Sequence, residues 1–217
     1  MRIAILGTGM VGRGLAARFA DLGHSVTVGT RDPERSTTGD GEYALWLAGE
    51  PTIDTRTFAE AAAAGEVVVN ATNGHVSLDV LHLAGAENLA GKVLIDLANP
   101  IEFGPEGLTL FVKDTDSLAE QIQRAFPDAR VVKTLNTMNV SMMVNPGQLA
   151  EETSVFVSGN DEAAKATTTR LLNELGHDDV IDLGDITTAR GTEMWLTLWI
   201  RLMQSLGTAT FNLKIVR

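Results

Sequence analysis

The sequence has no cysteine, so disulfides, thiolate metal sites and cysteine nucleophiles are excluded. Its four scattered histidines leave little for a metal centre, and we expect no bound metal. Positive charge is also scarce: 17 Lys and Arg against 28 Asp and Glu give a net charge of -11, which opposes general nucleic-acid binding. No apolar run approaches the roughly 18–20 uncharged residues of a membrane helix, and Gly7 comes too early for a signal peptide. We expect a soluble, cytoplasmic protein without membrane or nucleic-acid partners.

The apolar content, in contrast, is sufficient for a folded core. Hydrophobic residues make up 44% and charged residues 21% of the chain, which is richer in apolar side chains than disordered proteins are. A length of 217 residues fits one large domain, or a domain with an appended element.

A glycine-rich turn follows the first apolar run. Residues 2–6 predict a buried strand, apolar residues at three- and four-residue spacing then predict a helix that stops at Gly23, and residues 25–28 predict a second strand. Between the first strand and the helix stands a G-x-G-x-x-G match, formed by Gly7, Thr8, Gly9, Met10, Val11 and Gly12. In this context the glycines turn the chain, admit a pyrophosphate and let helix and strand pack, while the helix N-terminus attracts the anion. We predict that these residues bind a dinucleotide; a surface glycine turn is the alternative.

The end of the second strand indicates which dinucleotide is bound. An NAD-binding domain carries Asp or Glu about 20 residues after the fingerprint, where it holds the ribose 2′-hydroxyl. Here that position is Thr30, followed by Arg31 and, further on, Arg35. A hydroxyl and guanidinium groups suit a 2′-phosphate, because Arg presents several donors in a fixed fork. We predict NADP(H) as the cofactor; the alternative is Asp32 as the ribose acid, with both arginines solvated.

Strands and helices continue to alternate through the rest of the chain. We predict strands over residues 52–54, 66–70, 92–97, 130–133, 153–157 and 179–183, and helices over residues 41–49, 58–64, 77–83, 117–126 and 161–175. This alternation is typical of a Rossmann-type α/β fold, a doubly wound and mostly parallel sheet that binds ligands at the carboxyl ends of its strands. We assign residues 1–185 to this domain and residues 186–217 to a C-terminal apolar helix and tail.

Polar loops follow strands at that carboxyl edge, over residues 70–75, 96–100 and 133–140. Their amides and hydroxyls suit a ribose and a nicotinamide carboxamide and add no charge near a hydride. For each loop taken singly, the alternative to cofactor binding is that Asn, Gly and Pro simply form a turn. The candidate cofactor ligands in these loops are Thr72, Asn73, Asn99, Pro100, Asn136 and Thr137.

Few titratable side chains lie in these loops. His75 stands at a helix start, where histidines are usually solvated, so it is a weak candidate for a catalytic acid. We interpret Lys133 as the end of a strand rather than a catalytic base, and Asp96 as a loop cap. Hydride transfer depends on orientation in a dry pocket, and we name no general acid or base.

The last predicted helix, after Thr187, is apolar on nearly every face. Its polar positions form a narrow stripe of Thr197, Arg201, Gln204 and Thr208. Its tryptophans and methionines suit a dimer contact or the roof of a pocket for a planar ligand. The alternative is that they pack in the core of their own chain. We predict a homodimer built on Trp195, Trp199, Leu202 or Leu206, and an edge strand over residues 211–217.

Together these residues resemble the NADPH:coenzyme F420 oxidoreductases and, more distantly, the NADP-binding domain of ferric reductases. The resemblance spans essentially the whole chain and is carried by Gly-Thr-Gly-Met-Val-Gly, Val-Gly-Thr-Arg with Arg35, Val-Val-Lys-Thr-Leu-Asn-Thr and the closing helix. It implies direct hydride transfer between the nicotinamide and a stacked deazaflavin ring. The contacts that it implies are Thr8, Gly9, Met10, Val11, Thr30, Arg31 and Arg35 for phosphates and adenosine, and Asn73 and Val140 for the nicotinamide.

The chain departs from this family on the acceptor side. Archaeal members carry proline and an aromatic residue where this chain has Thr72 and Asn73, and an apolar residue where it has Asn139. We predict an NADP(H)-dependent oxidoreductase with coenzyme F420 as the small-molecule acceptor; another flavin, a quinone or an imine are alternatives. An NADP(H) sensor or regulatory module without turnover is the alternative of another class.

Overall fold

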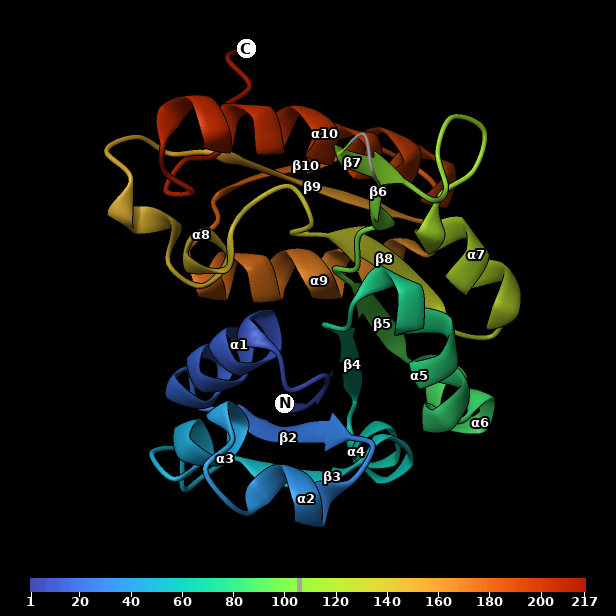
Figure 1. The fold of residues 1–217 in the computed structure, drawn as a ribbon. Coiled ribbons are helices and arrows are strands. Elements are labelled where there is room, and N and C mark those ends of the chain that lie inside the picture. Colours follow the sequence, from blue (N-terminus) through green and yellow to red (C-terminus); the bar gives the residue numbers. More distant parts are fainter. Residues whose placement is uncertain (105–106) are drawn as a thin grey trace.

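One eight-stranded sheet organises the protein (Figure 1). The structure, a computed structural model, describes residues 1–104 and 107–217. The sheet contains β1 (Arg2–Leu6), β2 (Ser25–Thr30), β3 (Asp54–Thr57), β4 (Val67–Asn70), β5 (Val93–Asp96), β8 (Arg130–Thr134), β9 (Ser154–Gly159) and β10 (Asp179–Asp182), in the order β10-β9-β8-β5-β4-β1-β2-β3. All neighbouring strands are parallel except β8 and β9. The predicted Rossmann-type, mostly parallel sheet is confirmed.

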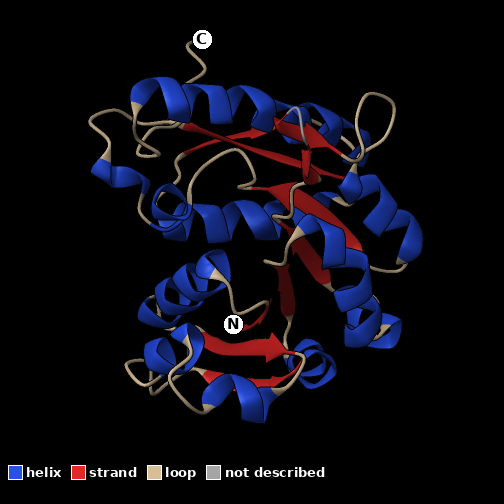
Figure 2. Cartoon of the chain, in the orientation of Figure 1, coloured by secondary structure: helices blue, strands red, loops and turns tan. Residues whose placement is uncertain are grey.

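Helices cover both faces of this sheet (Figure 2). One face packs against α1 (Met10–Asp21), α3 (Glu42–Leu47), α8 (Val140–Val144) and α9 (Glu162–Leu175). The other packs against α4 (Phe58–Ala64), α5 (Ser77–Ala84), α6 (Ala86–Leu89), α7 (Leu118–Ala125) and α10 (Ala189–Leu206). Shorter turns are α2 (Pro33–Thr37), η1 (Gly74–Val76), η2 (Pro146–Gln148) and η3 (Ile186–Thr188). Among the helices of the described residues, none combines the length and the hydropathy needed to cross a membrane.

Strand β9 runs antiparallel to β8, and the connection between them contains only short helices. Helix α8, with five residues, rises only about 7.5 Å, whereas β8 spans about 17 Å. The chain does not cross back over the sheet here: β9 starts at the edge where β8 ends and runs the opposite way. The chain from Thr134 to Val144 therefore stays at the carboxyl edge, which is where the site lies.

Two predictions of strands differ from the structure. The strand predicted over residues 52–54 begins only at Asp54, because the residues before Ile53 form a turn. The edge strand predicted over residues 211–217 is wrong. That segment is extended beside β9, where the Ser154 N–H donates to the Leu213 carbonyl oxygen at 2.8 Å, but it forms no regular ladder.

A hairpin that no sequence pattern indicated lies beside α10 (Figure 1). It pairs β6 (Ile101–Gly104) with β7 (Gly107–Leu110) in antiparallel fashion. Both strands are largely exposed, so they lack the apolar alternation by which a half-buried strand is recognised.

Candidate active site

The turn between β1 and α1 requires glycine at two positions for reasons internal to the chain. Gly7 has a φ of +121°, which L side chains rarely adopt, and a Cβ there would lie 2.8 Å from the Ala71 carbonyl oxygen. A Cβ on Gly12 would overlap the Gly7 carbonyl oxygen, so α1 could not approach β1 this closely. These two glycines are explained without a ligand.

Gly9 is different, because nothing in the chain requires a glycine there. Its φ of -71° is open to any residue, and a Cβ would meet no atom within 4 Å. Gly9 is also the N-cap of α1, which has neither a side-chain cap nor an acidic residue in its first turn. The first amide groups of α1 are therefore uncapped and carry the positive end of the helix dipole. This open cradle, flanked by Thr8, Met10 and Val11, fits a pyrophosphate.

The end of β2 presents a hydroxyl and two guanidinium groups. Thr30 is buried, and its Oγ1 lies 2.8 Å from Ser36 Oγ in a hydrogen bond. Arg31 and Arg35 are exposed, and their side chains form no hydrogen bond or ion pair with any described residue. Asp32 is the N-cap of α2, and its Oδ1 accepts from the Arg35 N–H at 3.0 Å. The free guanidinium groups of Arg31 and Arg35 suit a 2′-phosphate. A ribose hydroxyl would need the carboxylate of Asp32, one oxygen of which is engaged in the helix cap.

A cleft of about 170 Å³ opens at the carboxyl edge of the sheet, beside α1. It is lined by Val11, Ala71, Thr72, Asn73, Gly74, Leu97, Ala98, Asn99 and Ile101. It thus brings one fingerprint residue together with the loops after β4 and β5, and with three of the residues predicted for the nicotinamide end: Thr72, Asn73 and Asn99. None of the lining side chains is charged. The cleft is a neutral pocket next to the pyrophosphate cradle.

Other predicted residues are not part of the cleft lining: Pro100, Asn136, Thr137 and Val140. Asn136 is buried, and its Nδ2 donates to Asn99 Oδ1 and to the Thr192 carbonyl oxygen, each at 3.0 Å. Pro100 and Thr137 are buried as well. Val140 packs on α1, since a Cβ on Gly14 would lie 2.7 Å from Val140 Cγ2. Asn136 thus joins the loop after β8 to Asn99 and α10, and Val140 packs on α1.

His75 is exposed and continues the loop after β4. Its ring centroid lies 4.5 Å from that of Phe111, with the planes inclined by 32°. Its backbone N–H donates to Asn73 Oδ1 at 3.0 Å. The part of the chain that the structure describes contains no group of three or more His, Cys, Asp or Glu placed to hold a metal ion.

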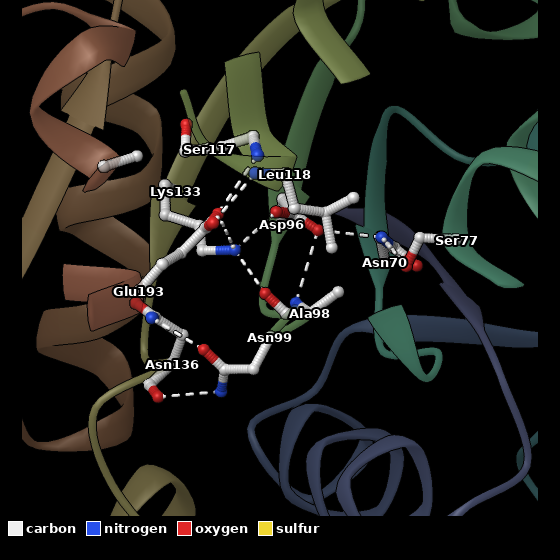
Figure 3. Close-up of polar contacts among 12 residues, drawn as sticks. Asn70, Ser77, Asp96, Ala98, Asn99, Ser117, Leu118, Lys133, Asn136 and Glu193 are labelled. Atoms are coloured by element: carbon white, nitrogen blue, oxygen red, sulfur yellow. Dashed lines mark hydrogen bonds and ion pairs between the residues drawn. The ribbon is translucent and has the colours of Figure 1, made fainter. Parts of the chain in front are cut away.

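Behind the cleft lies a buried charge network that no sequence pattern indicated (Figure 3). Lys133 Nζ lies 2.8 Å from Asp96 Oδ2 and 2.9 Å from Glu193 Oε1, and the three side chains are at most 2% exposed. Burial by itself disfavours the ammonium, but the adjacent carboxylates outweigh it, so the pKa of Lys133 is raised above its usual value. Asp96 does cap its loop, because its Oδ1 accepts from the Ala98 N–H at 3.3 Å. The interpretation of Lys133 as merely a strand end missed this partnership.

The fold and this site define a Rossmann-type dinucleotide-binding protein. The family described as NADP oxidoreductase, coenzyme F420-dependent, matches residues 2–100. A crystal structure from Arthrobacter sp. FB24, provisionally assigned as an F420-dependent NADP reductase, is 59% identical, with 100% of both chains covered and a TM-score of 0.97. The F420-dependent NADP reductase of Methanothermobacter marburgensis is 29% identical, with 93% of this chain and 92% of that protein covered. Metalloreductase STEAP3 of Rattus norvegicus is 31% identical over 88% of this chain, which spans only 36% of that longer protein.

The chain belongs to the family of F420-dependent NADP oxidoreductases. It is an NADP-dependent oxidoreductase, and its cofactor is NADP(H). The resemblance seen in the sequence, to this family and to the NADP-binding domain of ferric reductases, is confirmed, although by identity the metalloreductase is no more distant than the archaeal reductase.

Proposed function

We propose that the protein transfers a hydride between NADPH and a planar small molecule, and that this acceptor is the deazaflavin coenzyme F420. The observation that carries the proposal is the neutral cleft beside the pyrophosphate cradle. A hydride moves without help from a protein acid or base, so an uncharged lining that orients two rings and excludes water meets its needs. The two relatives described as F420-dependent NADP reductases support the choice of acceptor.

Each part of NADP(H) has residues that suit its chemistry. The 2′-phosphate has Thr30, Arg31 and Arg35 at the end of β2, and the pyrophosphate has the backbone around Thr8, Gly9, Met10 and Val11. At the nicotinamide end, Asn73 Oδ1 is engaged with the backbone of η1, which leaves Asn73 Nδ2 available to the carboxamide. Bound NADPH supplies the hydride; the chain binds and orients it.

A pair of neighbouring rings at the rim of the cleft suits the acceptor. His75 follows Gly74, which lines the cleft, and the Phe111 N–H donates to the Pro100 carbonyl oxygen at 2.9 Å, next to Asn99. Both rings are exposed. A flat ring can therefore stack on them without any rearrangement of the core.

We also propose that the protein forms a homodimer through α10. Trp199 is engaged within its own chain, where it stacks on Phe211 with ring centroids 5.4 Å apart. Leu198 and Leu206, in contrast, are 48% and 56% exposed. Together with Leu202 they repeat at intervals of four along the helix, so they form one apolar stripe suited to a second copy of the chain.

The test is an anaerobic assay in which NADPH-loaded protein is mixed with coenzyme F420, FMN, a quinone or a cyclic imine. We expect rapid reduction of F420 and slower or no reduction of the others. Transfer of deuterium from the nicotinamide C4 to the deazaflavin checks that the hydride passes directly. Binding of NADPH with no turnover on any acceptor would support the sensor alternative, and preference for another acceptor would overturn the assignment of F420.

A further inference from the structure

Hydrogen bonds join the network of Asp96, Lys133 and Glu193 to the cleft lining (Figure 3). Besides its two carboxylate partners, Lys133 Nζ donates to the carbonyl oxygen of Ala98, a residue of the lining. Asp96 Oδ1 accepts from Asn70 Nδ2 at 2.7 Å and from the Ala98 N–H at 3.3 Å. The loop after β5 is thus held at Ala98, through both the carbonyl oxygen and the N–H of that residue.

Asn70 extends this connection into the loop after β4. Its Oδ1 accepts from Thr72 Oγ1 at 2.6 Å and from the Thr72 N–H at 3.3 Å, and its Nδ2 also donates to Ser77 Oγ at 3.1 Å. Asn70 and Ser77 are both 0% exposed, so water does not compete for the bond between them. The place of Thr72 in the cleft therefore depends on Asn70, which is oriented in turn by Asp96.

Glu193 joins the same network to two helices on the other side. It stands on α10, and its carboxylate accepts from the Leu118 and Ala119 N–H groups at 2.8 and 3.0 Å. These are the first amide groups of α7, whose positive dipole end compensates the second carboxylate of the network. One set of bonds thus ties the loops of β4 and β5 to β8, α7 and α10.

Stability alone does not explain a network of this kind. Desolvation opposes the attraction of buried ions, and well-packed apolar side chains of similar size often give equal or greater stability. What a fully bonded polar network does provide is a single geometry, because each donor and acceptor has a fixed partner. Here that geometry is imposed on the loops that line the cleft.

We infer that Lys133, Asp96 and Glu193 are positioning residues for the nicotinamide end of NADP(H). They fix Thr72 and Ala98 in the cleft, whereas the 2′-phosphate residues on β2 and α2 form no bond to the network within the described chain. The inference rests on the proposed function. Loosening the network should weaken binding of the nicotinamide end and slow hydride transfer, and it should leave binding of the adenosine end unchanged.

The test variant is Glu193→Gln, which keeps the side-chain shape and removes the charge. The matched control is Arg190→Gln: Arg190 stands on the same helix and pairs with Glu120 of α7, Nε to Oε2 at 2.8 Å, so it joins the same two helices without reaching the cleft. Calorimetry measures Kd for NADP⁺ and for 2′,5′-ADP, which lacks the nicotinamide. Stopped-flow mixing measures kcat and KM for NADPH oxidation, and thermal melting reports folding.

We expect Glu193→Gln to raise Kd for NADP⁺ roughly tenfold, the worth of one charge-assisted hydrogen bond. It should also lower kcat and leave Kd for 2′,5′-ADP within about twofold of the wild type. Arg190→Gln should change neither ligand's Kd by more than about twofold. If Glu193→Gln does not fold, Asp96→Asn perturbs the network from β5 instead. It is judged by the same comparison of Kd for NADP⁺ with Kd for 2′,5′-ADP.

If Glu193→Gln weakens the binding of both ligands equally, or lowers the melting temperature with unchanged Kd values, the network has a purely structural role and the inference is overturned. The inference is also overturned if the wild-type protein binds NADP⁺ but no variant changes the Kd for NADP⁺ more than the Kd for 2′,5′-ADP. A wild-type protein that binds neither ligand overturns the proposed function itself, and the inference with it.

Discussion

The carboxylate of Asp32 accepts a hydrogen bond from the backbone N–H of Arg35 at 3.0 Å, so the acid nearest the end of β2 serves as a helix cap. The Arg35 side chain, in contrast, is free of partners among the described residues. This division of roles within one short turn favours the proposed 2′-phosphate site over a ribose site, because the guanidinium group is available and one oxygen of the acid is not.

The first prediction is therefore that NADPH binds more tightly than NADH, by about 2–4 kcal/mol. Arg31→Ala should lose most of this preference and leave NADH binding nearly unchanged. Fluorescence titration of both cofactors measures it. The control is Arg56→Ala, because exposed Arg56 on the adjacent strand already pairs with Asp54 at 2.6 Å. Equal affinity of the wild type for the two cofactors would contradict the prediction.

The second prediction separates a glycine needed by a ligand from one needed by the fold. Gly9→Val meets open space in an ordinary backbone region, so the free energy of unfolding should fall by no more than about 1 kcal/mol, the cost of a poorer N-cap residue. NADPH binding should nevertheless be lost, because the new side chain fills the pyrophosphate cradle. Gly12→Ala collides with the Gly7 carbonyl oxygen and should destabilise the fold by about 1–3 kcal/mol.

Urea unfolding and NADPH titration of these two variants decide the matter. A Gly9→Val protein that binds NADPH normally would show that the cradle holds no phosphate. A Gly12→Ala protein of full stability would show that α1 can shift away from β1 at no cost.

The third prediction concerns pH and follows from His177, which is buried and has Nε2 3.0 Å from the Met143 carbonyl oxygen. Burial lowers the pKa of His177 in the folded state, and the bond to Met143 opposes this only in part. The unfolded chain, with an ordinary pKa near 6.5, therefore takes up the proton first as the pH falls. Stability contributed by the neutral ring is complete above that value and is lost as the pH decreases below it.

Urea unfolding between about pH 7.5 and pH 5.5 measures this loss. His177→Gln keeps a donor for the Met143 carbonyl and should flatten the dependence on pH. The exposed His82→Gln serves as control and should leave the slope unchanged. An unchanged slope in His177→Gln would assign the acid sensitivity to other groups.

How much of the fold could be predicted depends on whether its signal is local. Helix α4 occupies the predicted residues because Thr57 caps its start and Gly65 follows its end. The exposed hairpin of β6 and β7 carries no apolar periodicity and was missed. The antiparallel direction of β9 was not predicted either, since no residue in the strand indicates which way it runs.

The same distinction holds for the site. The fingerprint from Gly7 to Gly12 and the turn from Thr30 to Arg35 each lie in one segment, so their chemistry can be recognised in the sequence. The pairing of Lys133 with Glu193 joins a strand to a helix that reads as almost wholly apolar, and only the tertiary fold brings these two side chains together. The side-chain bonds of Asn136 were hidden for the same reason.

The fourth prediction tests the dimer. Leu198→Glu places a charge in the exposed apolar stripe of α10 and should convert a dimer into a monomer at micromolar concentration, with the fold intact. Leu45→Glu is the matched control, because Leu45 is 65% exposed on α3 and outside the stripe. Light scattering coupled to gel filtration gives the mass of each protein. A wild-type monomer would overturn the proposal.

The fifth prediction concerns the acceptor. Asn73 lines the cleft and is exposed, so Asn73→Trp can fill the cleft without disturbing the core. Val140→Trp is less suitable, because Val140 packs tightly on Gly14 and a larger ring would displace α1. We expect Asn73→Trp to abolish NADPH oxidation and to leave the affinity for 2′,5′-ADP within about twofold, since the residues proposed for the adenosine end lie on β2 and α2.

The control for this variant is Val76→Trp, which adds the same ring to the same short turn at an exposed position outside the cleft lining. Stopped-flow mixing with coenzyme F420 measures turnover of both variants. If Val76→Trp retains turnover and Asn73→Trp does not, the loss arises at Asn73 itself, from occupation of the cleft or from loss of its side-chain hydrogen bonds, and not from a tryptophan in η1 as such. Full turnover in Asn73→Trp would place the reacting rings elsewhere, because a tryptophan in the cleft leaves no room for a nicotinamide against Thr72 and Asn99.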